Sequence, residues 1–522
     1  MKKSSNSSRS RTYQAAMNSM IGILTAVGNI LINFGVRVAI VHTLGEEING
    51  LHNLFQSLLS VLTVMETSMM TAMIIHMYEP MKNRDMEMVS QMMALYRKIY
   101  AGIAVLSLAI GGIVCLFLGK IIHSSLSMQT VRAYFLVFLA SAVANYLTYS
   151  YRIILFAEQK NRVSAMATLL SEFIFRICGL IVAWLMNNYV YYLIFMIAEK
   201  LCGNQICKLY VRHSYPDIDW SYCVGTDSQL RKKITDTVRP LFVSQLANML
   251  QNSSQSILLS MLLGSVAIVG YYGNYQLVMG AVGLMYSQIG AAFTSGFVNL
   301  ATEKDQGHMY DVYMSTVHLM SVLTIVICTG FLVCIQDFVA LMFGQGFLLS
   351  DRVVHILTAT LFTTLINIPV VSVQNAMGLH RCDSRWMVVQ AVLSVSLGYL
   401  GGVYWGIEGI LLGMLIPLLL LTTIYKGTLI YKIVFNTNWR KHVLCVVLLT
   451  FKGSLACATA WAVCKMIHTE GLVLDILLKG FCAIVVGVST VHVTSLRNRW
   501  HRQLICSAFE KLREMCKKFT KG

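Results

Sequence analysis

Long apolar runs separated by short polar turns constrain this chain more than any other feature of its sequence. A helix of about 20 apolar residues crosses the roughly 30 Å hydrocarbon core of a bilayer, and about fourteen such runs can be counted. They lie near residues 17–41, 51–78, 99–118, 132–151, 163–186, 189–208, 240–263, 266–297, 312–335, 353–376, 386–405, 408–430, 443–465 and 472–495. Only 12% of the residues are charged, and the mean hydropathy is +0.64. The sequence therefore predicts an all-α integral membrane protein with about 14 transmembrane helices.

The basic residues indicate how these helices are oriented, because the cytoplasmic loops of membrane proteins are enriched in Lys and Arg. With both termini placed in the cytoplasm, nearly all basic residues between the runs fall in cytoplasmic loops. The exceptions on the outer side are Lys120, Arg132, Arg352 and Lys465. A missed span would reverse every later loop, so this asymmetry supports both the count and the orientation. The net charge of +17 is then a consequence of topology, and we expect no nucleic-acid partner.

Polar segments divide the chain into parts. Residues 212–239 form the longest polar stretch between apolar runs, and we interpret them as a cytoplasmic linker between an N-terminal lobe, 1–211 (spans 1–6), and a C-terminal lobe, 240–430 (spans 7–12). Residues 431–496 would hold an extra helical hairpin, spans 13 and 14. The tail, 497–522, places apolar residues at helical spacing among basic ones. This pattern is typical of an amphipathic helix on an anionic membrane surface, with a solvated tail as the alternative.

A faint repeat relates the two lobes. Each lobe contains one copy of a motif that reads Leu-Gly, a spacer, Gly, five residues and Gln. Its members are Leu44, Gly45, Gly50 and Gln56 in the first lobe, and Leu263, Gly264, Gly270 and Gln276 in the second. Both lobes begin on the cytoplasmic side, so the repeats would be parallel and related by an axis along the membrane normal. A cavity between two lobes is the expected result.

Two charges interrupt the first pair of apolar runs. A charge at the centre of a span costs about 2.5–3.5 kcal/mol on insertion scales, so it usually faces a bundle interior, a polar cavity or a partner. Arg37 lies close before Leu44, and its guanidinium can alternatively snorkel to the nearer interface. Glu66 lies roughly 22 Å along a helix from Leu51, at 1.5 Å per residue, and we expect it to face a cavity.

Further polar side chains lie inside the runs. Glu172 and Arg176 are four residues apart on one helix face, so they can form a structural ion pair as readily as a substrate site. Asp475 and Lys479 repeat this spacing in the last hairpin, where a structural pair is the leading interpretation. Amides at helical spacing must face protein or water in lipid. The amides of this kind are Asn29 and Asn33 in the first run, and Asn248, Gln251, Asn252 and Gln255 in the seventh.

The sequence lacks the common signatures of enzymes. It contains no Walker motif, no GxGxxG after a strand, no HExxH and no GxSxG. The fourteen Cys are scattered without metal-binding spacing, and we expect no metal and no cofactor. One acidic pair, Asp217 and Asp219, has the DxD spacing of metal-binding acids in sugar-nucleotide transferases, but it lies in the predicted linker. We therefore predict that the protein is not an enzyme.

Several segments together resemble a known family. They are RVAIVHTLGEEINGLHNLF, ETSMMTAMIIHMYEPMKNRD, YRKIY, YRIILFAEQKNR, VGYYGNYQLVMGAVG, GFVNL and FGQGFLLSD. The chain up to about Tyr431 resembles the Wzx-type polysaccharide and oligosaccharide flippases, which belong to the multidrug, oligosaccharidyl-lipid and polysaccharide exporter superfamily. Arg37 and Glu66 match the charged positions of that family's first hairpin, and Tyr78 to Pro80 match its Tyr-x-Pro end.

The resemblance implies two six-helix lobes in a V, with two extra C-terminal helices. It implies a transporter of the bacterial cytoplasmic membrane that moves an undecaprenyl-diphosphate-linked oligosaccharide between leaflets, with membrane lipids, a polysaccharide polymerase and glycosyltransferases as partners. The expected substrate-binding residues are Arg37, Glu66, Asn33, Glu172, Arg176, Asn248, Gln251 and Gln255. Many relatives carry an acidic residue in the seventh span where this chain has Gln255, which puts an acid-dependent coupling role of that span in doubt.

Two alternatives from other classes stay open. One is a cation-coupled drug or metabolite antiporter of the same superfamily, which would place carboxylates in its cavity. The other is a membrane glycan polymerase or glycosyltransferase, a class that tends to carry a sizeable extracytoplasmic loop. The longest outer loop here is short, 336–352, which disfavours that class.

Overall fold

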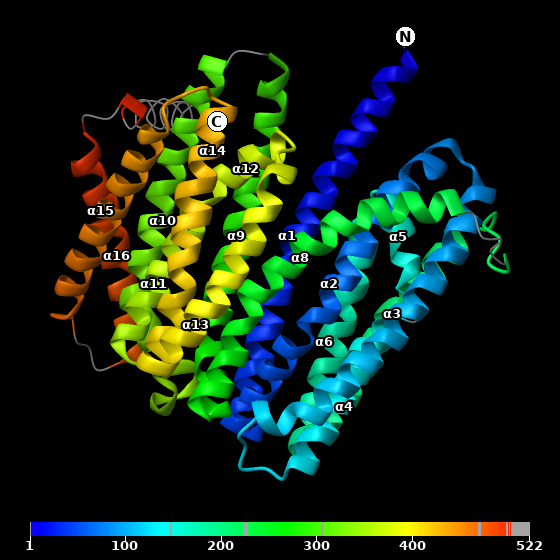
Figure 1. Ribbon diagram of the computed structural model, residues 1–522, viewed down its shortest axis with the longest axis horizontal. Coiled ribbons are helices and arrows are strands. Elements are labelled where there is room, and N and C mark those ends of the chain that lie inside the picture. The colour runs from blue at the N-terminus through cyan, green and yellow to red at the C-terminus, as the bar shows by residue number, and fades with distance from the viewer. Residues whose placement is uncertain are drawn as a thin grey trace, which may run out of the picture. The chain divides into compact units, whose positions relative to one another are not determined.

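The computed structural model describes residues 2–146, 149–222, 228–303, 306–467, 471–496, 499–500 and 502, and within these ranges it contains helices and loops but no strand. Figure 1 shows this all-helical architecture. The predicted fold class, an all-α membrane protein, is confirmed. Most of the predicted amphipathic tail, 497–522, lies outside the described residues.

The chain divides into two compact units, Met1–Gly273 and Asn274–Gly522. The helices that belong wholly to the first unit are α1 Lys2–Leu44, α2 Glu46–Asn83, α3 Met86–Ile121, α4 Met128–Tyr146, α5 Ser150–Ala157, α6 Asn161–Leu185, α7 Tyr189–Ser214 and α8 Ser228–Leu263. Within this unit α6 packs along α7, and α8 packs along α2. The segment predicted as a linker, 212–239, contributes to the end of α7 and the start of α8. The predicted lobe boundaries stay a prediction.

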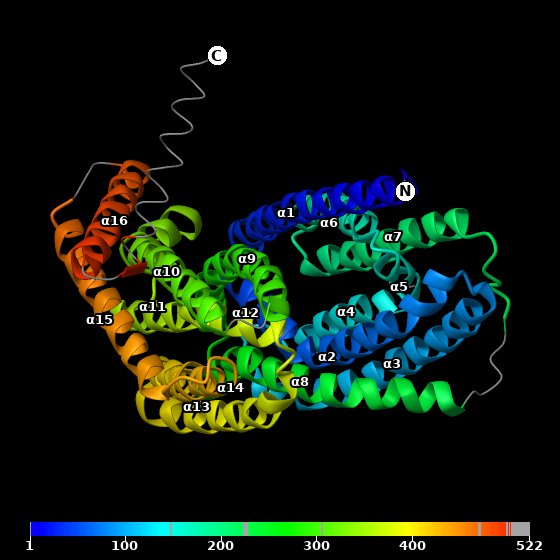
Figure 2. The same ribbon diagram turned by 90° about the horizontal axis from the view of Figure 1, so that it is seen from above.

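The second unit begins inside α9, Val266–Glu303. Its other elements are α10 Gln306–Phe343, the 3₁₀ turn η1 Gln345–Phe347, α11 Asp351–Ile366, α12 Ile368–Ala376, α13 His380–Pro417, the π-helical η2 Leu418–Lys426, α14 Gly427–Ile433, α15 Trp439–Cys464 and α16 Leu472–Ser495. The two C-terminal helices, α15 and α16, pack against each other and against α10, as Figure 2 shows.

Local sequence signals explain where many helices begin. The side chain of Asp85 accepts a hydrogen bond from the backbone N–H of Met88 and caps α3. Asn188 caps α7 and Ser350 caps α11 in the same way. Gly45, with φ 93°, separates α1 from α2 in a conformation that favours glycine. The short polar turns read from the sequence therefore end one helix and cap the next.

The helix α13 reverses direction in its middle, at Gly406. This residue has φ 60° and ψ −137°, which only glycine adopts readily. The backbones on either side of it lie in direct contact, because a Cβ atom at Gly413 would overlap the carbonyl of Leu397 and one at Gly401 would overlap that of Gly409. Two antiparallel helices meet at this glycine, and the break lies between the predicted spans 386–405 and 408–430.

The predicted count of fourteen spans is not confirmed. In the described part of the chain, ten helices are long and apolar enough to cross a membrane, or eleven if α4 and α5 form one bent span. Two physical causes account for the lower number. The helices α7 and α8 carry many polar side chains, which lower their hydropathy. The segment Arg385–Ile433 is counted as one apolar helix, although the chain reverses direction at Gly406. The exact number therefore stays a prediction.

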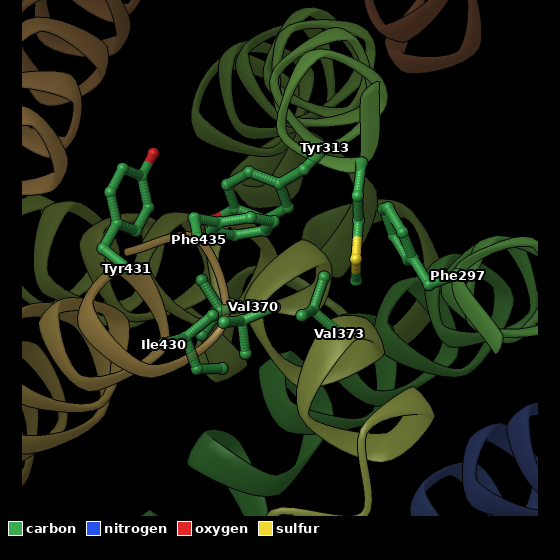
Figure 3. Close-up of a cluster of buried hydrophobic side chains, with 9 residues drawn as sticks. Phe297, Tyr313, Val370, Val373, Ile430, Tyr431 and Phe435 are labelled. Atoms are coloured by element: carbon green, nitrogen blue, oxygen red, sulfur yellow. The ribbon is translucent and has the colours of Figure 1, made fainter. Parts of the chain in front are cut away.

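Aromatic side chains fill the core of each unit. In the first unit Phe55 of α2 makes edge contacts with Phe135 and Phe138 of α4. In the second unit, buried side chains of α9, α10, α12, α14 and the two residues after α14 form the cluster in Figure 3, where Tyr313 and Phe435 lie 4.8 Å apart between ring centroids. These contacts fix the helices that carry the polar groups described next.

The faint sequence repeat has a structural counterpart. A Cβ atom at Gly50 of α2 would overlap the carbonyl oxygen of Val266, and one at Gly270 of α9 would lie 3.1 Å from the backbone nitrogen of Gly50. The two glycines of the repeat therefore meet where the first turns of α2 and α9 pack. Asn49 donates a hydrogen bond of 3.5 Å to the carbonyl of Gly270 across this close helix contact.

Candidate functional site

A stripe of polar side chains follows one face of α6. Ser164, Thr168, Glu172 and Arg176 are spaced four residues apart, so each lies about one turn above the last on the same face. The opposite face is apolar and exposed, and its members include Phe173. The stripe lies where α6 packs on α7, so these polar groups face protein rather than lipid.

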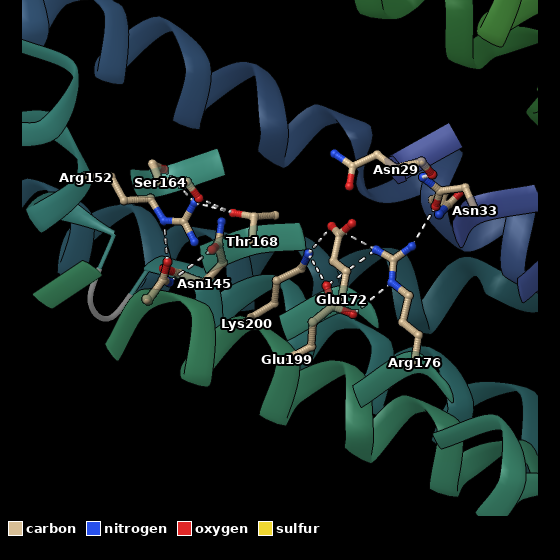
Figure 4. A network of polar contacts seen from close by, with 12 residues as sticks. Asn29, Asn33, Asn145, Arg152, Ser164, Thr168, Glu172, Arg176, Glu199 and Lys200 are labelled. Carbon is tan, nitrogen blue, oxygen red and sulfur yellow. Dashed lines mark hydrogen bonds and ion pairs between the residues drawn. The ribbon is translucent and has the colours of Figure 1, made fainter. Parts of the chain in front are cut away.

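Four charges meet near the middle of α6 and α7. The guanidinium of Arg176 contacts the carboxylates of Glu172 at 3.1 Å and Glu199 at 2.9 Å. The ammonium of Lys200 lies 2.7 Å from Glu199 and 3.9 Å from Glu172 (Figure 4). The predicted ion pair of Glu172 and Arg176 is therefore present. Because two cations face two carboxylates, this group is neutral as a whole.

Asn33 of α1 joins this charge group. Its side-chain oxygen accepts a hydrogen bond of 2.6 Å from Arg176, and its amide nitrogen donates to the carbonyl of Asn29 at 2.8 Å. The structure thus brings together three of the predicted site residues, Asn33, Glu172 and Arg176. Their role in binding stays a prediction.

Arg152 of α5 has a different environment. Its guanidinium donates to Asn204 at 2.7 Å, to Ser164 at 3.0 Å and to Thr168 at 2.7 Å, and it lies 5.5 Å from the ring centre of Tyr149. All four partners are neutral. Among the described residues no carboxylate lies within ion-pair distance of this cation, so its charge is not compensated by a direct contact.

A chain of amides connects Arg152 to Glu66. Asn204, whose oxygen accepts from Arg152, donates to the side-chain oxygen of Asn145 at 3.1 Å. Asn145 in turn donates to the Glu66 carboxylate at 3.0 Å. The described residues provide no ion pair for Glu66. We refer to the following set as the inner polar cluster: Asn33, Glu66, Asn145, Arg152, Ser164, Thr168, Glu172, Arg176, Glu199, Lys200 and Asn204.

Arg37 lies apart from this cluster, between α1 and α2. Its Nη2 donates to the side-chain oxygen of Asn53. The Nη1 of Arg37 and the amide nitrogen of Asn53 are buried and have no hydrogen-bond partner among the residues that the structure describes. A Cβ atom at Gly273 would lie 2.8 Å from that Nη1, so glycine there leaves room for the guanidinium. This position inside the helix packing favours an interior role for Arg37 over snorkelling.

The amides of α8 do not form a single buried stripe. Asn248 and Asn252 are exposed, whereas Gln251 and Gln255 are half-buried. The side-chain oxygen of Gln255 accepts a hydrogen bond from the hydroxyl of Tyr272. These contacts neither bring the predicted amides to the inner polar cluster nor test their role.

The second unit holds one further charge group and a cavity. Lys479 of α16 lies 2.7 Å from Asp337 of α10 and 2.8 Å from Asp475, so the predicted pair of Asp475 and Lys479 ties the last helix to α10. A separate cavity of about 430 Å³ is lined by α10, α11 and α15. Phe362 and Trp461 are among its residues, and its lining contains no carboxylate, Lys or Arg.

Asp219, one member of the acidic pair between α7 and α8, has a local role. The carboxylate of Asp219 accepts from the backbone N–H of Ser221 at 2.8 Å and from its hydroxyl at 2.6 Å. These hydrogen bonds lower the pKa of Asp219. In the described part of the chain no group of three or more His, Cys, Asp or Glu side chains is arranged to hold a metal ion.

The fold and these polar groups define a class: a multi-pass membrane protein with charged and amide side chains packed between its helices. The particular family follows from comparison. The sequence model of the family described as "Polysaccharide biosynthesis protein" matches residues 15–295, more than half of the chain. The chain belongs to this family, which confirms the resemblance seen in the sequence. No curated protein matches it in a sequence search.

Solved structures share the fold. The lipid II flippase MurJ in an inward closed conformation superposes with a TM-score of 0.66 at 12% identity, covering 94% of this chain and 100% of that one. An inward-facing multidrug resistance MATE transporter of the MOP superfamily gives 0.59 at 14% identity, covering 83% and 99%. The Vibrio cholerae MATE transporter VcmN gives 0.57 at 16%, covering 83% and 99%. Identities this low show a common fold.

Sequence reasoning missed part of the inner polar cluster. The sorting of basic residues places Arg152 in a cytoplasmic loop, and the sequence pattern singles out neither Glu199 nor Lys200 as a binding residue. Asn145 and Asn204 were also passed over. The missing signal was the alignment of Ser164 and Thr168 with Glu172 and Arg176, which marks one face of α6 as polar over three turns.

Proposed function

We propose that the protein is a transporter that moves an undecaprenyl-diphosphate-linked oligosaccharide from the inner to the outer leaflet of the bacterial cytoplasmic membrane by alternating access. Membership of the polysaccharide biosynthesis family and a fold shared with a lipid II flippase support this proposal. The transported glycan would then serve polysaccharide assembly. Both termini would lie in the cytoplasm, with a polymerase and glycosyltransferases as partners.

The observation that carries the proposal is the excess of cations in the first unit. Arg37 and the inner polar cluster together contain four cations, Arg37, Arg152, Arg176 and Lys200. They contain three carboxylates, Glu66, Glu172 and Glu199. Four minus three leaves a net charge of +1 if all are ionised. A cation excess among apolar helices is costly unless an anion compensates it.

The uncompensated cations are the two arginines whose direct partners are neutral. Arg37 is bound by an amide, and Arg152 by an amide and two hydroxyls. A guanidinium grips two phosphate oxygens at once, with charge-assisted hydrogen bonds. We infer that these two side chains hold the lipid diphosphate at different stages of transport.

The remaining predicted site residues have supporting roles in this proposal. Asn33, Glu172 and Arg176 would shape the charge group beside the diphosphate. The amides Asn248, Gln251 and Gln255 of α8 would offer hydrogen bonds to sugar hydroxyls.

The charge excess also weighs against the alternative function, a cation-coupled drug antiporter. A cationic drug would require carboxylates that are free to face it, but Glu172 and Glu199 are both engaged by Arg176 and Lys200, which leaves only Glu66 in the inner polar cluster without an ion pair among the described residues. The similarity to MATE transporters concerns the fold and does not favour this substrate class.

Glycan export in a strain that lacks the native protein tests the proposal. With membrane abundance matched, Arg37→Ala should abolish export and Arg37→Lys should retain part of it, because Lys keeps the charge but loses the planar fork. Arg352→Ala is the control, because the side chain of Arg352 is 84% exposed. Wild-type export by Arg37→Ala would remove Arg37 from the site.

A further inference from the structure

The three carboxylates of the inner polar cluster are not equivalent. Glu172 and Glu199 each contact Arg176, and Lys200 adds a second cation to both. Glu66 has no ion pair among the described residues, and its hydrogen-bond donors are neutral: the amide of Asn145 and the hydroxyl of Tyr149. One carboxylate in the interior of the first unit is therefore left without a cation in direct contact.

The groups that face Glu66 from the neighbouring helices do not change this conclusion. They are Tyr100 of α3, Asn145 and Tyr146 of α4, Tyr149 directly before α5, Arg152 in α5, and Lys200 of α7. The two cations in this set are engaged elsewhere. Lys200 bonds to Glu199 at 2.7 Å, and Arg152 bonds to Asn204 at 2.7 Å. Their charge reaches Glu66 only over a distance.

Glu66 is half-buried, and a carboxylate that is partly removed from water and has no counter-ion gains by taking up a proton. The neutral acid keeps the hydrogen bond from Asn145, because its carbonyl oxygen still accepts. Its new O–H can donate to a neighbouring acceptor. The site therefore accommodates both the charged and the neutral form of Glu66.

We propose that Glu66 is a proton-binding site whose occupancy sets the charge balance around Arg152. When Glu66 releases its proton, the amides of Asn145 and Asn204 connect a carboxylate to the guanidinium, and the positive charge is partly compensated. When the carboxylate takes a proton from water, that compensation is lost. An anion beside Arg152 is then held more strongly.

This inference rests on the proposed function where it names a lipid diphosphate as the anion. Binding equilibria that influence each other do so reciprocally. A diphosphate that binds next to Arg152 must therefore favour protonation of Glu66, and protonation must favour diphosphate binding. Proton uptake and diphosphate binding are therefore coupled through one carboxyl group. In the coupled step, the carboxylate of Glu66 takes up one H⁺ and becomes the neutral acid.

A purely structural role for Glu66 makes a different prediction. If Glu66 only accepts hydrogen bonds from Asn145 and Tyr149, it stays ionised at all pH values near neutrality. Glu66→Gln would then leave the proton uptake of the protein unchanged.

Infrared spectroscopy of the purified full-length protein tests the proton site without any ligand. The wild type should show a protonated-carboxyl band that disappears as the pH is raised, and Glu66→Gln should lack it. Glu87→Gln is the matched control, because Glu87 lies exposed in the first turn of α3, and it should keep the band. A band that is equal in the wild type and Glu66→Gln, or absent from both, would overturn the proposal.

Farnesyl diphosphate is the probe for the coupling. When the probe binds in weakly buffered solution, the wild-type protein should take up as much as about one proton per bound molecule. Glu66→Gln should bind the probe without proton uptake. Equal uptake by both proteins would contradict the coupling. If the wild type does not bind the probe, the diphosphate proposal fails, and the infrared result still decides whether Glu66 holds a proton.

Discussion

The ion pair between Arg176 and Glu199 offers the sharpest test of how the charge group holds α6 against α7. Two contacts join these side chains, Nε to Oε2 at 2.9 Å and Nη2 to Oε1 at 3.4 Å. The side chain of Glu199 is 1% exposed and that of Arg176 is 12% exposed. Removing one partner of a buried pair typically costs about 3–5 kcal/mol, because the other charge is left uncompensated.

The change is a double-mutant cycle of Arg176→Met and Glu199→Gln. Arg176→Met should destabilise the protein by about 3–5 kcal/mol, since it leaves two carboxylates to Lys200 alone. Glu199→Gln should cost about 1.5–3 kcal/mol, the range for hydrogen bonds to charged groups, because Arg176 keeps Glu172. The double variant should be less destabilised than the sum, with a coupling energy of about 1–3 kcal/mol.

Unfolding of the purified protein in mixed micelles with a rising SDS fraction gives these free energies. Arg352→Met is the control, and it should stay within about 0.5 kcal/mol of the wild type because its side chain is 84% exposed. A coupling energy below about 0.5 kcal/mol would refute the reasoning. Arg176 would then be available to a ligand rather than committed to Glu199.

Other predictions address separate parts of the molecule. Gly50→Ala should destabilise the protein by about 1–3 kcal/mol in the same micelle assay, because its Cβ would overlap the carbonyl of Val266; wild-type stability would contradict the close contact of α2 and α9. A reporter fused after Lys233 should be cytoplasmic and one after Ser350 extracytoplasmic, and the same side for both would contradict the predicted topology. A peptide of residues 497–522 should bind anionic vesicles and leave them at high salt, whereas salt-insensitive binding would contradict an electrostatic contact.

Much of the fold could be predicted from the sequence, because a membrane-spanning helix needs a long apolar run and the turns between runs carry glycines and caps. The break near residue 406 was visible as a short gap between two apolar runs. The number of spans was harder to establish. Helix α7 contains Glu199, Lys200 and Asn204, which lower its hydropathy although the helix is 26 residues long.

The candidate site was predictable where a charge interrupts an otherwise apolar run, as at Arg37, Glu66 and the pair of Glu172 with Arg176. Asn145, Arg152 and Asn204 were missed because they lie near the end of a run. Arg152 has the sequence appearance of a cytoplasmic anchor, yet it points to Asn204 between helices. Sequence spacing cannot distinguish these two directions, because a long flexible side chain reaches either.

Central to the proposed function is that the arginines in excess in the first unit, Arg37 and Arg152, bind a lipid diphosphate during its transport. The most direct measurement is translocation of a fluorescent undecaprenyl-diphosphate glycan in proteoliposomes that contain the purified protein. The account predicts transport by the wild type and by Arg352→Gln. It predicts loss of transport by Arg152→Gln and by Arg37→Ala at equal reconstitution. Full transport by both of these variants, or no transport by the wild type, would contradict it.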